Sequence, residues 1–70
     1  MEDHVYKKIE IVGTSEISSD AALHSAIEKA SNSIHNLRWF EIMETRGSIK
    51  DGAIDRWQVT IKVGFTMKNK

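Results

Sequence analysis

The chain has 70 residues, ten Lys and Arg against ten Asp and Glu, and no cysteine. This length predicts a single domain over residues 1–70. The balanced charge argues against a dedicated nucleic-acid-binding protein, and the lack of cysteine excludes disulfides and thiolate metal sites. No apolar run approaches the ~18 residues of a membrane span, and residues 1–4 do not resemble a signal peptide. We therefore expect a small cytoplasmic domain without nucleic-acid or membrane partners.

The first half of the chain predicts one strand followed by one helix. Residues 4–12 alternate as in a strand, and the Gly-Thr-Ser sequence at 13–15 is expected to end it. Ser18 and Ser19 then offer N-cap oxygens, and Asp20 offers a first-turn acid. Apolar residues that follow recur at helical spacing and predict a helix of about 18 residues. They are Leu23, Ala26, Ile27, Ala30, Ile34 and Leu37.

The second half predicts a long β-hairpin formed by residues 39–50 and 53–67. Asp51-Gly52 between them is typical of a type I′ turn, which needs positive φ at both positions. If Lys50 faces Ala53, the register follows, although a bulge at Gly47 would shift it by one residue. On the buried side Phe40 then faces Val63, and Ile42 faces Ile61. The pairs on the other side are Trp39 with Gly64, Glu41 with Lys62, Met43 with Thr60 and Thr45 with Gln58.

These elements predict an α+β fold of order β-α-β-β, with a three-stranded antiparallel sheet packed on one helix. The helix covers one side of the sheet, and the other side carries Tyr6, Val12, Trp39 and Met43 among charged residues. We expect other subunits to cover this second side. The large ring of Trp39 on it requires a partner, which is either another protein surface or a flat ligand.

Three collinear stretches resemble the dodecins, a family of small flavin-binding proteins. They are residues 4–15 (HVYKKIEIVGTS), 36–47 (NLRWFEIMETRG) and 58–65 (QVTIKVGF), and together they span nearly the whole chain. The resemblance implies a β-α-β-β fold that assembles into a hollow homododecamer. It also implies paired flavins at two-fold subunit contacts, stacked against a tryptophan from each of two subunits.

The resemblance assigns candidate site residues one by one. Trp39 matches the stacking tryptophan, and Gln58 matches the glutamine that hydrogen-bonds the polar edge of the isoalloxazine ring. Glu44 and Arg46 fall near the ribityl or phosphate end of the flavin. Bacterial members often carry arginine where this chain has Thr66, a departure that weakens the case for tight binding of phosphorylated flavins.

One geometric problem accompanies these assignments. In the simple register Gln58 faces Thr45, six residues along the strand from Trp39, which is roughly 20 Å at ~3.3 Å per residue. One straight sheet cannot bring Trp39 and Gln58 to the same ring. Strong curvature, a bulge or a neighbouring subunit must therefore bring them together, and we favour assembly across a subunit contact.

The preferred function is non-catalytic flavin binding, meaning storage, sequestration or buffering of riboflavin, FMN or related flavins. FAD and coenzyme A are further candidate ligands. The alternative is a small oligomeric scaffold or interaction module in which Trp39 only anchors an interface, and a flavoenzyme ranks third. We expect no catalytic residues, because the serines lack an organised base, and no metal site, because His4, His24 and His35 are too dispersed.

Overall fold

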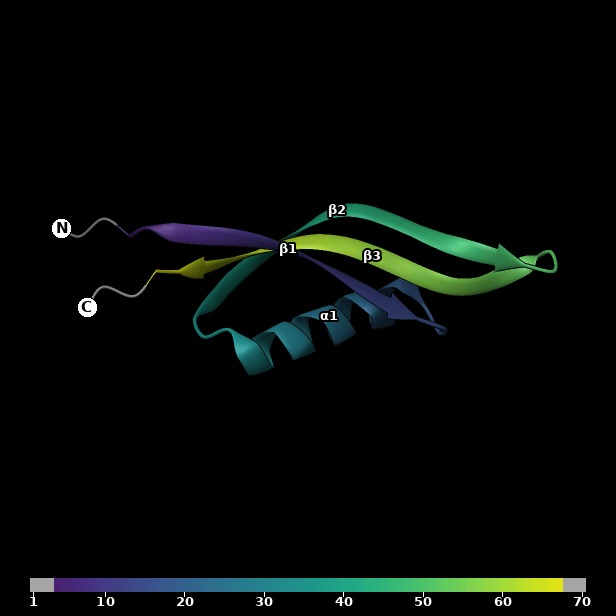
Figure 1. The fold of residues 1–70 in the computed structure, drawn as a ribbon, viewed down its shortest axis with the longest axis horizontal. Coiled ribbons are helices and arrows are strands. Elements are labelled where there is room, and N and C mark those ends of the chain that lie inside the picture. Colours follow the sequence, from purple (N-terminus) through teal and green to yellow (C-terminus); the bar gives the residue numbers. More distant parts are fainter. Residues whose placement is uncertain (1–3, 68–70) are drawn as a thin grey trace.

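The computed structural model describes residues 4–67 and shows a three-stranded sheet with one helix against it (Figure 1). The chain order is β1 (Tyr6–Ser15), α1 (Ser19–Ser33), β2 (Leu37–Lys50) and β3 (Ala53–Thr66). The strands are antiparallel in the spatial order β1-β3-β2, so that the last strand in sequence is the central one. The predicted β-α-β-β fold is therefore confirmed.

Helix α1 begins where the sequence predicts and ends earlier. The Ser18 hydroxyl accepts a hydrogen bond from Ala21 N at 3.0 Å, and Asp20 lies in the first turn. The helix has 15 residues rather than about 18, because Ile34 is already extended. Asn36 then adopts a φ of 68°, a left-handed conformation that asparagine tolerates well, and turns the chain into β2. Leu37 thus belongs to the sheet, which corrects its assignment to the helix.

Strand β1 continues through the residues that were expected to end it. Gly13, Thr14 and Ser15 pair with Val59, Gln58 and Trp57 of β3. Gly13 permits the helix to approach closely, since a Cβ there would overlap the Ala22 carbonyl oxygen and lie 2.8 Å from the Ala26 Cβ. The glycine therefore serves helix–sheet packing rather than strand termination.

The core lies between α1 and the central strand. Val59, Ile61 and Val63 of β3 are buried under the small side chains of Ala22 and Ala26 of α1, and Ala30 on the same helix is also buried. Phe40 and Ile42 face Val63 and Ile61 as predicted, but they are 46% and 50% exposed. The expectation that they are buried in one chain is wrong, because α1 packs mainly over β1 and β3 and leaves β2 uncovered.

The β2–β3 register agrees with the prediction at both ends of the hairpin and shifts in between. Lys50 faces Ala53, and Trp39 faces Gly64, while Asp51 and Gly52 both have positive φ. The pairing omits Met43 on β2 and Asp55 on β3, so the residues between them are displaced by one. Met43 therefore does not face Thr60, and Gln58 faces Arg46 instead of Thr45; neither shift occurs at Gly47.

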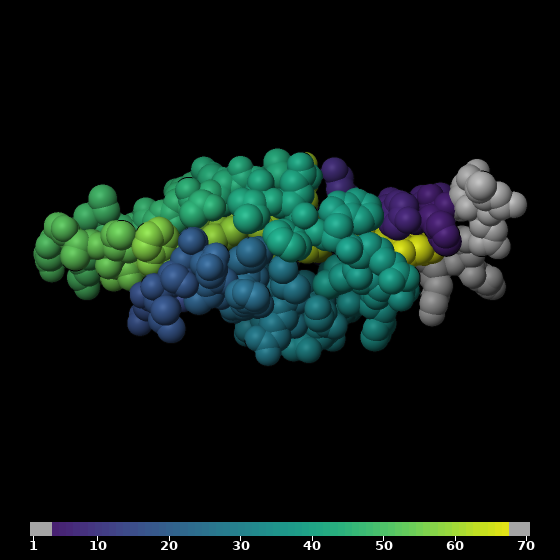
Figure 2. Space-filling view, turned by 180° about the vertical axis from the view of Figure 1, so that it is seen from behind, coloured from purple at the N-terminus to yellow at the C-terminus, as the bar shows by residue number. Residues whose placement is uncertain are grey.

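The protomer is elongated, with principal extents of 56 × 20 × 13 Å. The tip of the β2–β3 hairpin projects beyond α1, as both the ribbon and the space-filling view show (Figures 1 and 2). Ile49 and Ile54 near this tip are exposed. Within the part of the chain that the structure describes, no helix is long and apolar enough to cross a membrane.

We expect Gly13→Ala to destabilise the fold by about 1–3 kcal/mol, the usual cost of an overpacked core. The added methyl group must push the Ala22 backbone away from β1. Lower backbone entropy of the unfolded chain offsets only about 0.4–1 kcal/mol of this cost. Urea unfolding at fixed protein concentration measures the difference, with Thr14→Ala at the exposed neighbouring position as the control. Equal unfolding midpoints for Gly13→Ala and wild type would show that the helix does not approach β1 so closely.

Candidate functional site

Trp39 lies flat against the backbone of the central strand. It faces Gly64 in the register, and a Cβ at Gly64 would overlap the six-membered part of the indole ring. Gly64 is buried under this ring, while Trp39 itself remains 40% exposed. One face of the indole is thus supported by the strand, and the other remains available to a flat partner.

The ring of Tyr6 packs against the indole. Its ring centroid is 5.0 Å from that of Trp39, with an interplanar angle of 72°, which is an edge-to-face contact. Tyr6 belongs to β1 and Trp39 to β2, so the two rings meet across the central strand. The missing side chain of Gly64 allows this meeting, and the result is a pre-ordered aromatic surface.

This surface belongs to the side of the sheet that faces away from α1, which we call the open face. Val59, Ile61 and Val63 of β3, and the residues paired with them on β1 and β2, point towards α1. The residues that alternate with them along each strand point to the open face. The open face carries Tyr6, Lys8, Glu10, Val12 and Thr14 of β1, Trp39, Glu41, Glu44 and Arg46 of β2, and Gln58, Thr60, Lys62, Gly64 and Thr66 of β3.

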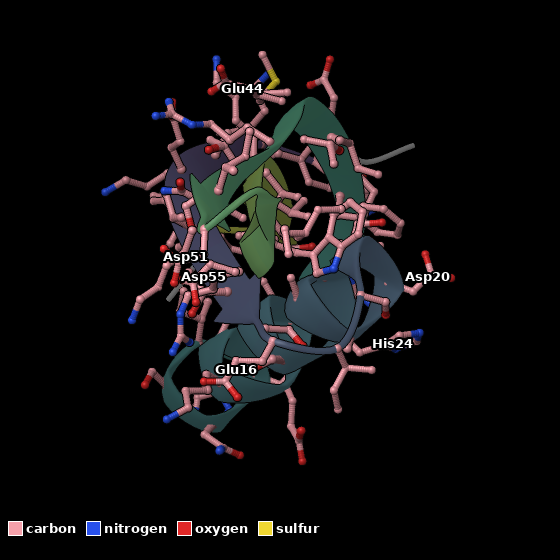
Figure 3. The ribbon with its side chains drawn as sticks, turned by 90° about the vertical axis from the view of Figure 1, so that its right-hand side faces the viewer. Glu16, Asp20, His24, Glu44, Asp51 and Asp55 are labelled. Carbon is pink, nitrogen blue, oxygen red and sulfur yellow. The ribbon has the colours of Figure 1, made fainter. Side chains whose placement is uncertain are left out.

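Charged and polar side chains gather at the other end of the open face. Arg46 Nη1 lies 3.9 Å from Glu44 Oε2, and Arg46 faces Gln58 across the strand pair. Figure 3 shows Glu44 on the side of the sheet away from α1, whereas Asp20 and His24 extend from the helix. The shift at Met43 produces this arrangement, since an uninterrupted register would put Thr45 opposite Gln58.

The structure brings three of the four predicted site residues together and leaves the fourth apart. Glu44, Arg46 and Gln58 are neighbours, but Trp39 faces Gly64, six residues along β3 from Gln58. That spacing is about 20 Å for an extended strand. The bulge at Met43 does not shorten this distance, because Gly64, which Trp39 faces, and Gln58 both lie on β3. A single ring that contacts Trp39 and Gln58 therefore requires another copy of the chain or strong curvature.

Three further residues around Trp39 were not identified as site residues from the sequence. Tyr6 contacts its ring, and Arg38 precedes it and donates from Nε to Thr66 Oγ1 at 3.0 Å. Lys8 lies 4.0 Å from the Glu41 carboxylate, although Glu41 faces Lys62 in the register as predicted. Tyr6 had a detectable signal, because the sequence already placed it on the same side of the sheet as Trp39. Arg38 and Lys8 had none, because their contacts depend on the register.

Residues 4–67 contain no group of three or more His, Asp or Glu side chains arranged to hold a metal ion within one chain. His24 extends from α1 (Figure 3), and α1 lies on the other side of the sheet from the open face. The site is thus built from aromatic rings at one end and a guanidinium, a carboxylate and an amide at the other. Such a set suits a flat ligand with polar edges.

Comparison with known proteins points to one family. The dodecin family model matches residues 5–68. Thermus thermophilus dodecin is 42% identical over 64 residues, which cover 91% of this chain and 93% of that protein. The structure of dodecin from Streptomyces davaonensis superposes with a TM-score of 0.92 at 47% identity, covering 97% of this chain and all of that one.

A more distant relative has a different ligand in its name. The structure of calcium dodecin from Mycobacterium tuberculosis, described as having a novel calcium-binding site, superposes with a TM-score of 0.80. It is 30% identical and covers 94% of each chain. The fold, the family model and the identities agree, and the chain belongs to the dodecin family.

Proposed function

We propose that this protein binds flavins without turning them over, by stacking the isoalloxazine ring on Trp39 at a two-fold contact between copies. The observation that carries the proposal is the state of the indole: it packs on the backbone at Gly64, it contacts the ring of Tyr6, and it remains 40% exposed. A large aromatic ring held in this way on an uncovered sheet face is matched to a flat, electron-poor ring system.

The second half of the proposed site comes from a neighbouring copy. The amide of Gln58 offers both a donor and an acceptor, which match the alternating N–H and C=O groups of a flavin's pyrimidine edge. Because Gln58 is six residues along β3 from the position of Trp39, a second subunit supplies it to the same ring. Arg46 and Glu44, next to Gln58, then lie near the ribityl or phosphate end of the ligand.

The oligomer follows from the surfaces that one chain leaves uncovered. Trp39 and Tyr6 on the open face, and Phe40 and Ile42 beside α1, are all more than a third exposed. A chain of 70 residues buries only about 60% of its unfolded surface and gains stability by association. We propose the hollow homododecamer of the dodecins as the assembled form, working in the cytoplasm. Sedimentation as a monomer would contradict this assembly.

The biological role that we propose is storage and buffering of riboflavin or FMN, with FAD and coenzyme A as further ligands to test. Burying the ring between indoles restricts its photochemistry and its access to oxygen and reductants. The absence of catalytic residues and of metal ligands remains a prediction from the sequence. Steady oxidation of NAD(P)H by the flavin-loaded protein would favour a flavoenzyme instead.

Titration of riboflavin with the purified protein tests the proposed function. We expect flavin fluorescence to fall to a saturating low level, because an indole stacked on the isoalloxazine quenches its emission by electron transfer. The same titration with a calcium chelator should give the same curve, which separates flavin binding from a calcium-dependent site. Undiminished fluorescence, together with no riboflavin retained in equilibrium dialysis, would refute flavin binding and favour the scaffold alternative.

A further inference from the structure

Arg38 is displaced from the regular pairing of β2 in a way that orients it towards the aromatic surface. Leu37 faces Phe65 and Trp39 faces Gly64, so Arg38 is an extra residue at a shift in register. Such bulges redirect a side chain relative to the regular alternation of a strand. The Arg38 Nε donates to Thr66 Oγ1 at 3.0 Å, which holds the guanidinium over β3.

This hydrogen bond places Arg38 at one end of the aromatic pair. Thr66 faces Tyr6 across the β1–β3 pairing, and the ring of Tyr6 contacts Trp39. Arg38 is also the direct chain neighbour of Trp39, with Cα atoms about 3.8 Å apart. The guanidinium is exposed, so a ligand on the outer face of the indole can reach it.

The charge of Arg38 is not matched by a carboxylate within the described residues. Lys8, Arg46 and Arg56 each lie within 4.0 Å of a carboxylate of residues 4–67, and Arg38 does not. The partner of its Nε is the neutral hydroxyl of Thr66. The two terminal nitrogens remain as a planar fork, the geometry that binds a phosphate through two parallel hydrogen bonds.

Arg46, the other candidate for an anion, is placed less well in the same chain. It lies 3.9 Å from Glu44, which partly neutralises it, and it faces Gln58 far from the indole. Thr66 was expected to weaken phosphate binding because it replaces an arginine that is common in bacterial relatives. In the structure the Thr66 hydroxyl accepts the hydrogen bond from Arg38 Nε and so orients its guanidinium.

We propose that Arg38 sets the preference of this protein for flavins that end in a phosphate, so that it selects FMN over riboflavin. The inference rests on the proposed function, in which the ring stacks on Trp39. The ribityl chain leaves that ring at its edge, and its phosphate meets the fork of Arg38. Arg38 thus distinguishes two ligands that share the same ring, and Thr66 holds it in position.

The test compares riboflavin and FMN affinities by fluorescence quenching for wild type and three variants. We expect Arg38→Gln to lose about ten- to a hundredfold in FMN affinity, the range for a hydrogen bond to a charged group. Its riboflavin affinity should stay within about twofold, which also shows that the variant folds and assembles. Thr66→Val should give a smaller loss for FMN only, and Lys29→Gln, which changes an exposed lysine on α1 away from the open face, should leave the FMN-to-riboflavin ratio unchanged.

Two further arms make the result decisive. Arg38→Lys keeps the charge but loses the fork, so an intermediate FMN affinity supports two-point recognition of the phosphate. Raising the salt concentration should reduce the FMN preference of wild type and leave that of Arg38→Gln unchanged. An unchanged FMN affinity in Arg38→Gln, or an equal loss of affinity for both flavins, would overturn the role proposed for Arg38 but not the proposed flavin binding. Wild-type protein that binds neither flavin would overturn the proposed function and this inference together.

Discussion

Replacing Trp39 by alanine is expected to lower riboflavin affinity by about fivefold to a hundredfold and to abolish the quenching of bound flavin. Stacking of a flat base on an aromatic side chain contributes about 1–3 kcal/mol, which corresponds to a change of about fivefold to a hundredfold in affinity. The indole packs on Gly64 and Tyr6 without reaching the core, so the fold should tolerate its removal. Fluorescence titration measures both affinity and quenching.

Two control variants separate stacking from structural effects. Trp39→Phe retains a flat ring and should keep more affinity than Trp39→Ala, with weaker quenching. Trp57→Phe changes the other tryptophan, which alternates with the open-face residues and lies on the side of α1. Its flavin binding should equal that of wild type. Unchanged affinity in Trp39→Ala would show that the stacking mechanism is wrong. Dissociation of the oligomer in that variant, with no flavin bound by wild type, would favour the scaffold alternative.

Replacing Ile61 by alanine is expected to cost about 2–5 kcal/mol of folding stability, a large share of the ~5–15 kcal/mol available to a small domain. Ile61 is fully buried, at 0% exposure, and it lies between Ile11 and Ile42 in the sheet, beneath α1. A cavity at this position cannot easily collapse, because the strands on both sides are fixed by their pairing. Urea unfolding followed by tryptophan fluorescence measures the loss.

Ile54→Ala provides the matched control for Ile61→Ala on the same strand. Ile54 is 59% exposed near the hairpin tip, so its truncation should change stability by no more than about 0.5 kcal/mol. All unfolding curves must be taken at one protein concentration, because association stabilises the folded chain by mass action. A cost below about 1 kcal/mol for Ile61→Ala would contradict the core described above.

The sequence predicted those parts of the fold that depend on short-range chemistry. Asp51-Gly52 specified the turn and the pairing of Lys50 with Ala53. The predicted pairing of Trp39 with Gly64 also holds, because the shifts at Asp55 and Met43 offset each other. The N-cap at Ser18 was recognisable because its hydroxyl serves an amide three residues away. The position of Trp39 on the side of the sheet away from the helix was also predictable, since one helix cannot cover two sides of a sheet.

The remaining features depend on contacts between distant segments. The early end of α1 reflects the left-handed Asn36 and the pairing of Leu37 with Phe65, which compete with an otherwise continuous apolar stripe. The shifts at Met43 and Asp55 leave no mark on the alternation of either strand alone. Phe40 is exposed because α1 lies over β1 and β3 and not over β2. Hydrophobic periodicity shows which side of a strand is apolar, but not whether the helix covers that strand.

The strand order has a consequence for folding during synthesis on the ribosome. Within residues 4–67, β1 and β2 both pair with β3 and not with each other, and β3 is the last of these three strands to be synthesised. A nascent chain that ends before Ala53 has no sheet to form, and its two strands keep their backbone N–H and C=O groups unpaired. Unpaired strands are templates for aggregation. Formation of the sheet therefore waits for β3.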